Sequence, residues 1–328
     1  MKKILDKLFN HEQLSYKEAF DVLTKIGTGQ FNNSEIAAFL TVYIMRNISV
    51  DELSGFRNAL LELCVKVDFS DFDTIDLCGT GGDEKDTFNI STLSSFVVAG
   101  AGYKVAKHGN YGVSSGCGSS NVLEYLGYEF SNNIDKLKSE LERANITFLH
   151  APLFHPAMKY VAPVRREMKQ KTFFNMLGPL VNPSFPQNQS VGVYNLEVAR
   201  LYSYLLQKSG KNFSIIHALD GYDEISLTGE TKIINNKSEE IVSPNYFGFN
   251  IIDAQTISGG SDVKSSAKIF INVLENKATN EQKNVVLANS AIAIQTINSK
   301  LNIDDALAEA KQSLESGKAL NSLKIFLQ

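Results

Sequence analysis

The chain has 328 residues, enough for two packed units, and its 43% hydrophobic and 21% charged residues are typical of a globular protein. A net charge of −4 without a cluster of lysines and arginines argues against the basic surface that nucleic-acid binding requires. Three separated cysteines, and no apolar run long enough to span a membrane, predict a cytoplasmic protein with neither disulfides nor a membrane partner.

The first 70 residues predict a small helical domain. The capping box Ser15-x-x-Glu18 begins a helix that we expect to end at Gly27. A second helix is predicted from about Ser34, and the capping box Ser49-x-x-Glu52 begins a third. A later helix between prolines, at 163–183, is expected to pack back on this domain, although it lies within the α/β part of the sequence.

From Phe72 the sequence changes to short apolar runs that end at glycine-rich turns and precede helices, which is typical of parallel α/β units. The predicted fold class is α/β, with a small N-terminal helical domain and a larger α/β domain, 71–328, that has a mostly parallel central sheet. A hairpin is expected at 228–235, around Gly229 and Glu230. The predicted strands are 74–78, 190–194 and 213–219, and the predicted helices are 91–101, 121–126, 196–208, 263–274, 281–297 and 303–313.

The first segment that carries chemistry is 76–83, followed by 87–92. Glycines after a strand let the backbone approach an anion closely, and Ser91 or Thr92 would begin a helix whose free N–H groups attract phosphate. The alternative is a simple tight turn between a strand and a helix. The glycine spacing matches neither the dinucleotide-binding pattern nor the P-loop, so neither of those sites is predicted.

The second segment, 107–119, contains four glycines and three serines and leads into Asn121-x-x-Glu124, which predicts a capping box. A loop rich in small donors that ends at a helix start can bind phosphate, and two such loops can enclose one polyanion. Considered in isolation, Lys107 would be an ordinary surface lysine and His108 a hydrogen-bonded structural histidine.

The third segment, 220–224, follows a predicted strand. Gly221 indicates a turn, in which Asp223 and Glu224 can both reach one site. Paired carboxylates near phosphates favour Mg²⁺, a hard cation that takes oxygen ligands, and the alternative is a solvated acidic turn.

The fourth segment, 155–183, carries Arg165 on a predicted helix. An arginine on a helix can pair with a carboxylate through two parallel hydrogen bonds. Considered alone, this segment would be no more than a helix and a turn.

Together and in this order, the four segments resemble the anthranilate phosphoribosyltransferase family over nearly the whole chain. The resemblance implies an enzyme of tryptophan biosynthesis that transfers the phosphoribosyl group of 5-phosphoribosyl 1-diphosphate to the amino group of anthranilate. The products would be N-(5-phosphoribosyl)anthranilate and diphosphate. Two Mg²⁺ ions per subunit and a homodimer are also implied. Catalysis would rest on electrostatics and positioning, because a neutral aromatic amine needs no strong base before it attacks.

The resemblance also implies roles for individual residues. The implied Mg²⁺ ligands are Ser91, Asp223 and Glu224, and the implied anthranilate contacts are Gly79, Asn110 and Arg165. The commoner family pattern has an arginine where this chain has Tyr111, which removes one positive charge from the second loop. The positions that match contacts of phosphoribosyl diphosphate are Gly79, Gly82, Asp83, Thr87, Asn89, Ile90, Ser91, Thr92, Lys107, His108, Gly109, Asn110, Tyr111, Gly112, Val113, Ser114, Ser115 and Ser119.

Two alternatives share this fold. A pyrimidine nucleoside phosphorylase has a similar glycine loop followed by a lysine–glycine loop, but the motifs KHGN at 107–110 and NMLGP at 175–179 match the transferase better. A non-catalytic relative that binds nucleic acid would need a basic groove and could dispense with the acidic pair at 223–224.

Overall fold

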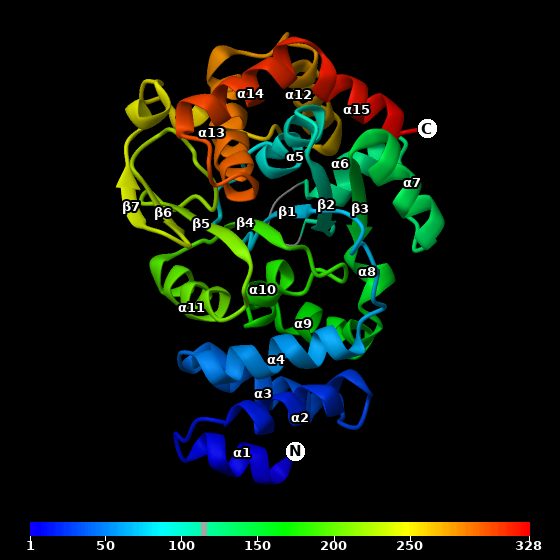
Figure 1. Ribbon diagram of the computed structural model, residues 1–328. Helices are drawn as coiled ribbons and strands as arrows, with labels where there is room; N and C mark the ends of the chain where they lie inside the picture. Colours follow the sequence, from blue (N-terminus) through cyan, green and yellow to red (C-terminus); the bar gives the residue numbers. More distant parts are fainter. Residues whose placement is uncertain (113–116) are drawn as a thin grey trace. The chain divides into compact units, whose positions relative to one another are not determined.

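The computed structural model describes residues 1–112 and 117–328 (Figure 1). Its internal contacts divide the chain into two compact units. One unit consists of Met1–Val67 and Ala151–Phe185, and the other of Asp68–His150 and Pro186–Gln328. The sequence suggested 1–70 and 163–183 for the helical domain, whereas by its contacts the returning segment starts directly after a strand that ends at His150.

Local capping fixes where the helices of the first unit begin. The two predicted capping boxes, at Ser15 and Ser49, are both present. The helix expected from Ser34 begins at Asn33, because the side chain of Asn32 caps it. The helices are α1 (Lys2–Phe9), α2 (Tyr16–Gly27), α3 (Asn33–Met45), α4 (Val50–Leu63), α8 (Ala151–Phe154), α9 (Ala162–Met168) and α10 (Phe174–Leu177), with 3₁₀ helices η1 (Pro156–Tyr160) and η2 (Gly178–Leu180).

After the short α8, the returning segment forms two α-helices, α9 and α10, where the sequence predicted one helix between prolines. A left-handed residue, Lys169, ends α9 with a φ of 52°. The ring of Phe173 stacks on that of Phe56 in α4, with 4.5 Å between the ring centroids. The amide of Val65 donates to the carbonyl of Phe154 at 2.8 Å. These contacts tie the returning segment to the N-terminal helices of its unit.

The second unit is built around a β-sheet. Its strands are β1 (Thr74–Gly79), β2 (Lys104–Gly109), β3 (Ile146–His150), β4 (Asn188–Gly192), β5 (Asn212–Ala218), β6 (Thr231–Asn235) and β7 (Glu239–Val242). Across the described residues the sheet order is β3-β2-β1-β4-β5-β6-β7. The pairings from β3 to β5 are parallel, and only those that involve β6 are antiparallel, so the predicted mostly parallel sheet is confirmed.

The sequence pattern misses two strands and misplaces a hairpin. The sequence pattern does not predict strands β2 and β3. It places the end of β2 in the loop 107–119, because Lys107 and His108 interrupt the apolar run of the strand. The hairpin predicted around Gly229 is wrong. The observed hairpin joins β6 to β7, and its turn consists of residues 236–238. The side chain of Asn235 builds that turn by accepting the amides of Lys237 (2.8 Å) and Ser238 (2.9 Å).

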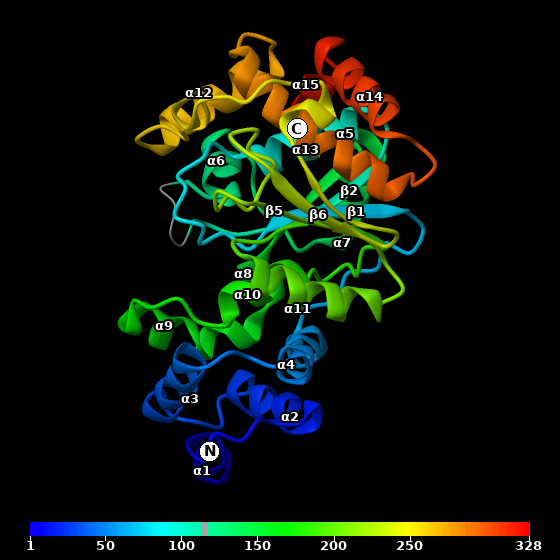
Figure 2. The same cartoon turned by 90° about the vertical axis from the view of Figure 1, so that its left-hand side faces the viewer.

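Helices cover both faces of the sheet. They are α5 (Ile90–Gly100), α6 (Ser119–Tyr125), α7 (Ile134–Ala144), α11 (Leu196–Gln207), α12 (Val263–Leu274), α13 (Asn280–Ile297), α14 (Ile303–Glu315) and α15 (Lys318–Phe326), with 3₁₀ helices η3 (Pro244–Phe247) and η4 (Ala254–Ile257). Figures 1 and 2 both show α11 on the opposite face of the sheet from α5 and α13. None of the helices within the described ranges is long and apolar enough to cross a membrane.

The strand order reverses between β1 and β4. From β1 the chain continues outward through β2 and β3, whereas from β4 it continues in the other direction through β5. The connections therefore leave on opposite faces of the sheet, as the positions of α5 and α11 show. Open parallel sheets bind ligands at such a point, beyond the carboxyl ends of the strands.

Candidate active site

The carboxyl ends of β1 and β4 meet at two glycines, Gly79 and Gly192, which are paired in the sheet. A Cβ atom on either glycine would overlap Asp223, at its carboxylate from Gly79 and at its backbone carbonyl from Gly192. The amide of Thr80 donates to the carbonyl of Gly192 at 2.9 Å and leads the chain into the glycine loop. Asp223 can lie at these strand ends because neither glycine carries a side chain.

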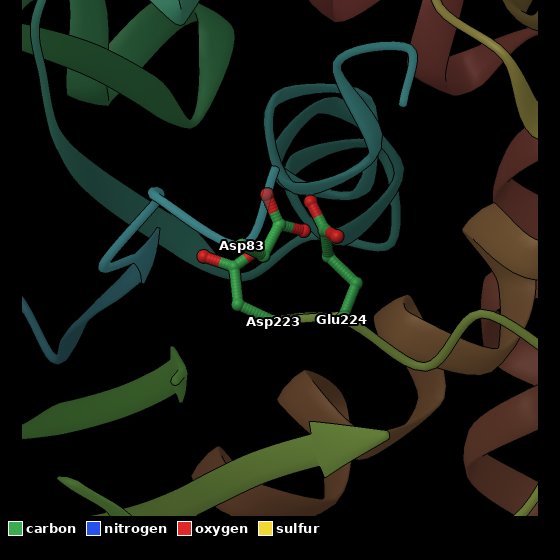
Figure 3. Close-up of side chains that lie close together, drawn as sticks. All are labelled: Asp83, Asp223 and Glu224. Atoms are coloured by element: carbon green, nitrogen blue, oxygen red, sulfur yellow. The ribbon is translucent and has the colours of Figure 1, made fainter. Parts of the chain in front are cut away.

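Three carboxylates gather beside these glycines (Figure 3). Asp223 and Glu224 follow the turn after β5, and Asp83 belongs to the loop after β1. One carboxylate oxygen from each residue lies within 4.8 Å of the others. Gly221, with a φ of 105°, makes the tight turn that precedes the acidic pair. The prediction that Asp223 and Glu224 reach one site is confirmed, and Asp83 joins them.

The glycine loop contacts this acidic group through its backbone. The amide of Gly81 donates to Oδ2 of Asp223 at 2.7 Å. Gly81 and Gly82 have φ angles of 60° and 76°, in the left-handed region that favours glycine. In this structure the Gly81 amide therefore serves the Asp223 carboxylate, and the anion-binding role of the loop stays a prediction.

The acidic group is electrostatically strained unless a cation joins it. Burial and the nearby Asp83 raise the pKa of Asp223 to about 6, while burial and Asp223 raise the pKa of Glu224. The Oε2 atom of Glu224 is buried and accepts no hydrogen bond within the described part of the chain. Crowded carboxylate oxygens with an unsatisfied atom among them fit a hard cation such as Mg²⁺.

Lys107 lies at the end of β2 and is 2% exposed, so it is not the surface lysine of the simpler interpretation. Its ammonium group donates to the carbonyl of Leu77 and lies 3.5 Å from Oγ of Ser91. Burial lowers the pKa of Lys107, while Asp223 and Glu224 are among the acidic groups that favour its charged form. Lys107 therefore places its side-chain nitrogen between β1 and α5.

Helix α5 begins where the sequence predicted a phosphate-binding helix start. Asn89 precedes the helix, and Ile90, Ser91 and Thr92 form its first turn, whose N–H groups have no partner within the helix. The side-chain amide of Asn89 donates to the carbonyl of Cys117 at 3.0 Å, which connects the first loop to the second. Thr87, the remaining residue predicted in this loop, forms an isolated bridge with Ser258.

The second loop is described at its two ends, and Val113, Ser114 and Ser115 lie outside the described residues. Oγ of Ser119 donates to the carbonyl of Asn110 at 3.3 Å, and a Cβ on Gly109 would overlap that Oγ. His108 is 3% exposed, and its amide donates to the buried carboxylate of Asp76 at 3.1 Å. The two ends of the loop therefore lie together beyond β2.

The capping box predicted at Asn121 is wrong, because α6 begins at Ser119 and makes Asn121 its third residue. The side-chain oxygen of Asn121 instead accepts the amides of Gly112 and Gly118, each at 3.0 Å. The spacing of Asn121 and Glu124 predicted a cap, but the side-chain oxygen of Asn121 binds the amides of two glycines from opposite ends of the loop. These two hydrogen bonds hold the loop ends together.

Tyr111, at the position of the family's commoner arginine, is held by its own neighbours. Its hydroxyl group donates to Oε1 of Glu124 at 3.1 Å, and its ring meets the edge of His150 with 4.9 Å between centroids. His150 in turn stacks on Phe130 and lies 2.9 Å from Oγ of Ser120. Tyr111 therefore fastens the loop to α6 and β3.

Arg165 lies on α9 in the helical unit. Its Nη2 donates to the side chain of Asn175 at 3.2 Å, and its guanidinium group lies 5.5 Å from the ring centroid of Phe174. Its Nε atom is buried and has no hydrogen-bond partner among the residues that the structure describes. Burial lowers the pKa of Arg165. Such a guanidinium group retains a donor for a carboxylate.

Comparison with known proteins identifies the family. A family model described as the glycosyl transferase family α/β domain matches residues 71–320, and the helical bundle domain of the same family matches residues 2–64. The anthranilate phosphoribosyltransferase of Flavobacterium psychrophilum is 60% identical over 324 residues, which cover 99% of this chain and 98% of the relative. This chain belongs to the anthranilate phosphoribosyltransferase family. The family member of Bacteroides thetaiotaomicron is 51% identical and is matched over 100% of this chain and 99% of its own length.

Solved anthranilate phosphoribosyltransferases have the same fold. The enzyme of Thermus thermophilus matches with a TM-score of 0.92 and 28% identity over 98% of each chain. The enzyme of Saccharomyces cerevisiae, in complex with PRPP and Mg, matches with a TM-score of 0.91 and 27% identity over 98% of this chain and 95% of the other.

The structure brings together only part of the set expected for an anthranilate phosphoribosyltransferase. Gly79, Ser91, Asp223 and Glu224 line one small hollow, whereas Arg165 belongs to the helical unit. A larger cavity of about 220 Å³, between the β6–β7 hairpin and the end of α13, contains none of the expected residues. The chemistry of the lining, and not the cavity size, therefore marks the site.

The sequence did not identify Asn289 of α13, which also lines the hollow. Its signal was an asparagine beside Ser290 in a helical run, 285–294, whose other residues are apolar.

Proposed function

We propose that the hollow at the ends of β1 and β4 is where this chain performs the reaction of its family. The chain is an anthranilate phosphoribosyltransferase of tryptophan biosynthesis, and it transfers the phosphoribosyl group of 5-phosphoribosyl 1-diphosphate to the amino group of anthranilate. The observation that carries this location is the acidic group of Asp83, Asp223 and Glu224 beside the start of α5. Anionic sugar phosphates and a cation are the ligands that such a combination recruits.

The two loops would enclose the sugar donor. The N–H groups of Ser91 and Thr92 in the first turn of α5 suit its phosphate oxygens, with Gly82, Thr87 and Asn89 beside them. Lys107 to Ser119 would close over the donor from β2 and α6. Contacts with Val113, Ser114 and Ser115 are proposed from the resemblance alone.

Mg²⁺ would be held by Asp223 and Glu224, with Ser91 completing the proposed set and Asp83 available from the glycine loop. The yeast relative was solved with PRPP and Mg, which supports this assignment. The proposal of two ions per subunit rests on the family resemblance. When bound, Mg²⁺ would neutralise charge on the diphosphate as it leaves.

The reaction forms a bond between the anthranilate nitrogen and the anomeric carbon and breaks the bond from that carbon to diphosphate, with release of one proton. Reaction at an anomeric carbon passes through an oxocarbenium-like transition state in which the leaving group gains negative charge. The side-chain nitrogen of Lys107 and the N–H groups at the start of α5 would stabilise that charge by donating hydrogen bonds. The amine is neutral near pH 7, so a strong general base is not needed.

Anthranilate would be oriented through its carboxylate by Arg165, with Gly79 and Asn110 as further contacts. The buried Nε of Arg165 supports this role, because it remains available as a donor. The complex of the yeast enzyme with 4-fluoroanthranilate supports a binding site for this class of acceptor in the family. The homodimer is proposed from the resemblance, and the cytoplasmic location also from the unpaired cysteines.

The decisive experiment follows the loss of anthranilate fluorescence when the purified full-length chain receives phosphoribosyl diphosphate and Mg²⁺. Turnover that stops on addition of a chelator is expected. Absence of turnover, combined with phosphorolysis of thymidine or uridine, would overturn the assignment in favour of a pyrimidine nucleoside phosphorylase.

A further inference from the structure

Asn289 makes a buried connection between α13 and the acidic turn. The residue is 6% exposed and lies on the long helix that covers the sheet. Its side-chain oxygen accepts the amide of Ile225 at 3.0 Å, and its side-chain nitrogen donates to the carbonyl of the same residue at 2.9 Å. A third hydrogen bond, to the carbonyl of Val285 at 2.8 Å, fixes the amide to its own helix.

Ile225 directly follows Glu224 in the chain. Its side chain is 1% exposed, and both of its backbone polar groups bond to Asn289, so the residue has little freedom to move. Asn289 also lines the hollow together with Asp223 and Glu224. The restraint therefore acts at the residue next to the acidic pair and from the same side as the hollow.

The other restraints on the acidic pair act at Asp223. Its carboxylate accepts the amide of Gly81, and its backbone carbonyl packs against Gly192. Oε2 of Glu224, by contrast, is buried and unsatisfied within the described residues. The backbone position of Glu224 is thus held on one side by Asp223 and on the other by the amide of Asn289.

We propose that Asn289 is a positioning residue that holds Glu224 in register with Asp223 for the metal ion. This inference rests on the proposed function, because it assumes that the acidic pair binds Mg²⁺. Partners that orient metal ligands are worth about 10- to 100-fold in metal affinity. We expect the lower end of that range, because Asn289 acts through the backbone and not on the carboxylate itself.

The test uses Asn289→Leu, which keeps the size of the side chain and removes all three hydrogen bonds. The matched control is Thr296→Val on the same helix, since Thr296 bonds to Ile292 and to Ser214 of β5 but not to the acidic turn. The primary readout is the dissociation constant of Mn²⁺ for the full-length protein without substrates, followed by electron paramagnetic resonance. The second is the Mg²⁺ concentration that gives half-maximal rate.

In Asn289→Leu the dissociation constant of Mn²⁺ and the Mg²⁺ concentration for half-maximal rate should both rise about ten-fold. The KM for anthranilate should change less than about two-fold. Thr296→Val should lose comparable thermal stability and keep the Mn²⁺ affinity of the wild type. Should Asn289→Leu not fold, Asn289→Ala takes its place, because its smaller side chain leaves room for water to solvate Ile225.

Wild-type Mn²⁺ affinity in a folded Asn289 variant would overturn the positioning role and leave the proposed function standing. Equal weakening in Thr296→Val would also overturn it, because general loosening of α13 would then be sufficient. If the wild-type protein itself bound no Mn²⁺ and needed no Mg²⁺ for turnover, the proposed metal site would fail, and this inference with it.

Discussion

The carboxylate of Asp223 packs directly against the Cα atom of Gly79, so closely that a Cβ on Gly79 would overlap it. A strand end and a turn separated by more than 140 positions in the chain thereby share one point in space. The identity of residue 79 is coupled to the position of a proposed metal ligand.

Gly79→Ala should lower kcat by at least about 100-fold, because displacement of a ligand by about 1 Å misaligns the reacting groups. The fluorescence assay at saturating Mg²⁺ measures the effect, and circular dichroism verifies the fold. Gly229→Ala is the matched control, since Gly229, like Gly79, lies outside the left-handed region, but its Cβ would make only an ordinary contact with Asp220, at 3.6 Å. Equal activities of the two variants would contradict the coupling.

Metal-free protein should lose stability as the pH rises through 6. The pKa of Asp223 is raised from 3.8 to about 6, so the stabilisation present below pH 3.8 is lost as the folded-state carboxyl ionises near pH 6. A shift of about two units corresponds to about 3 kcal/mol. In chelator, Tm should therefore fall between about pH 4 and about pH 6.5, and the Tm of Asp223→Asn should fall less over this range. Parallel curves for the two proteins would refute this.

Mg²⁺ should stabilise the wild type more at about pH 7.5 than at about pH 5, because only the ionised carboxylates attract the ion. The rise in Tm on addition of excess Mg²⁺ measures this effect at each pH. Asp223→Asn should show a smaller rise at both values. A rise that does not depend on pH would mean that Mg²⁺ binds elsewhere.

Arg165→Ala should raise the KM for anthranilate by at least about 30-fold, which is the loss of about 2 kcal/mol from a buried charge pair. The KM for phosphoribosyl diphosphate should change less than about three-fold. Arg166→Ala is the control, because Arg166 is the next residue of α9 and is exposed. Equal losses for both substrates would count against a role in binding the acceptor.

Tyr111→Phe should leave the KM for phosphoribosyl diphosphate within about five-fold of the wild type, because an exposed hydroxyl bond to Glu124 contributes only about 1 kcal/mol. Tyr111→Ala should raise that KM further, since it removes the ring that meets His150 and fastens the loop. A larger effect in Tyr111→Phe than in Tyr111→Ala would indicate direct contact of the hydroxyl with the donor.

Local chemistry explains what could be read from the sequence. The capping boxes at Ser15 and Ser49 depend on residues three positions apart, and the start of α5 depends on the segment that contains Ser91. The turn at Gly221 likewise needs only its own backbone. Such features depend on residues within one or two helical turns of one another, so they can be predicted from the sequence alone.

Long-range contacts explain what could not be read. Strand β2 contains Lys107 and His108, whose polar side chains are buried by the surrounding fold, so its sequence does not resemble that of an interior strand. Asp83 lies beside the acidic pair in space, although it belongs to a loop far from that pair in the chain. The position of Asn289 at the site becomes evident only from its hydrogen bond to Ile225, which is 64 positions away in the chain. Without neighbours in space, none of these side chains has a distinctive pattern.

The interrupted course of the helical unit constrains the order in which the protein can fold during synthesis. Helices α1 to α4 leave the ribosome first, but Phe173, which stacks on Phe56, emerges only after β1, β2 and β3 have been made. Contacts between residues so far apart in the chain form late, because closing the chain between them costs entropy before the contacts can stabilise the fold. The side of Phe56 that contacts Phe173 therefore stays without this partner until the returning segment, which ends at Phe185, has been synthesised. A single cut in the gene cannot separate the two units, and an isolated helical unit would require its two pieces to be joined by a new linker.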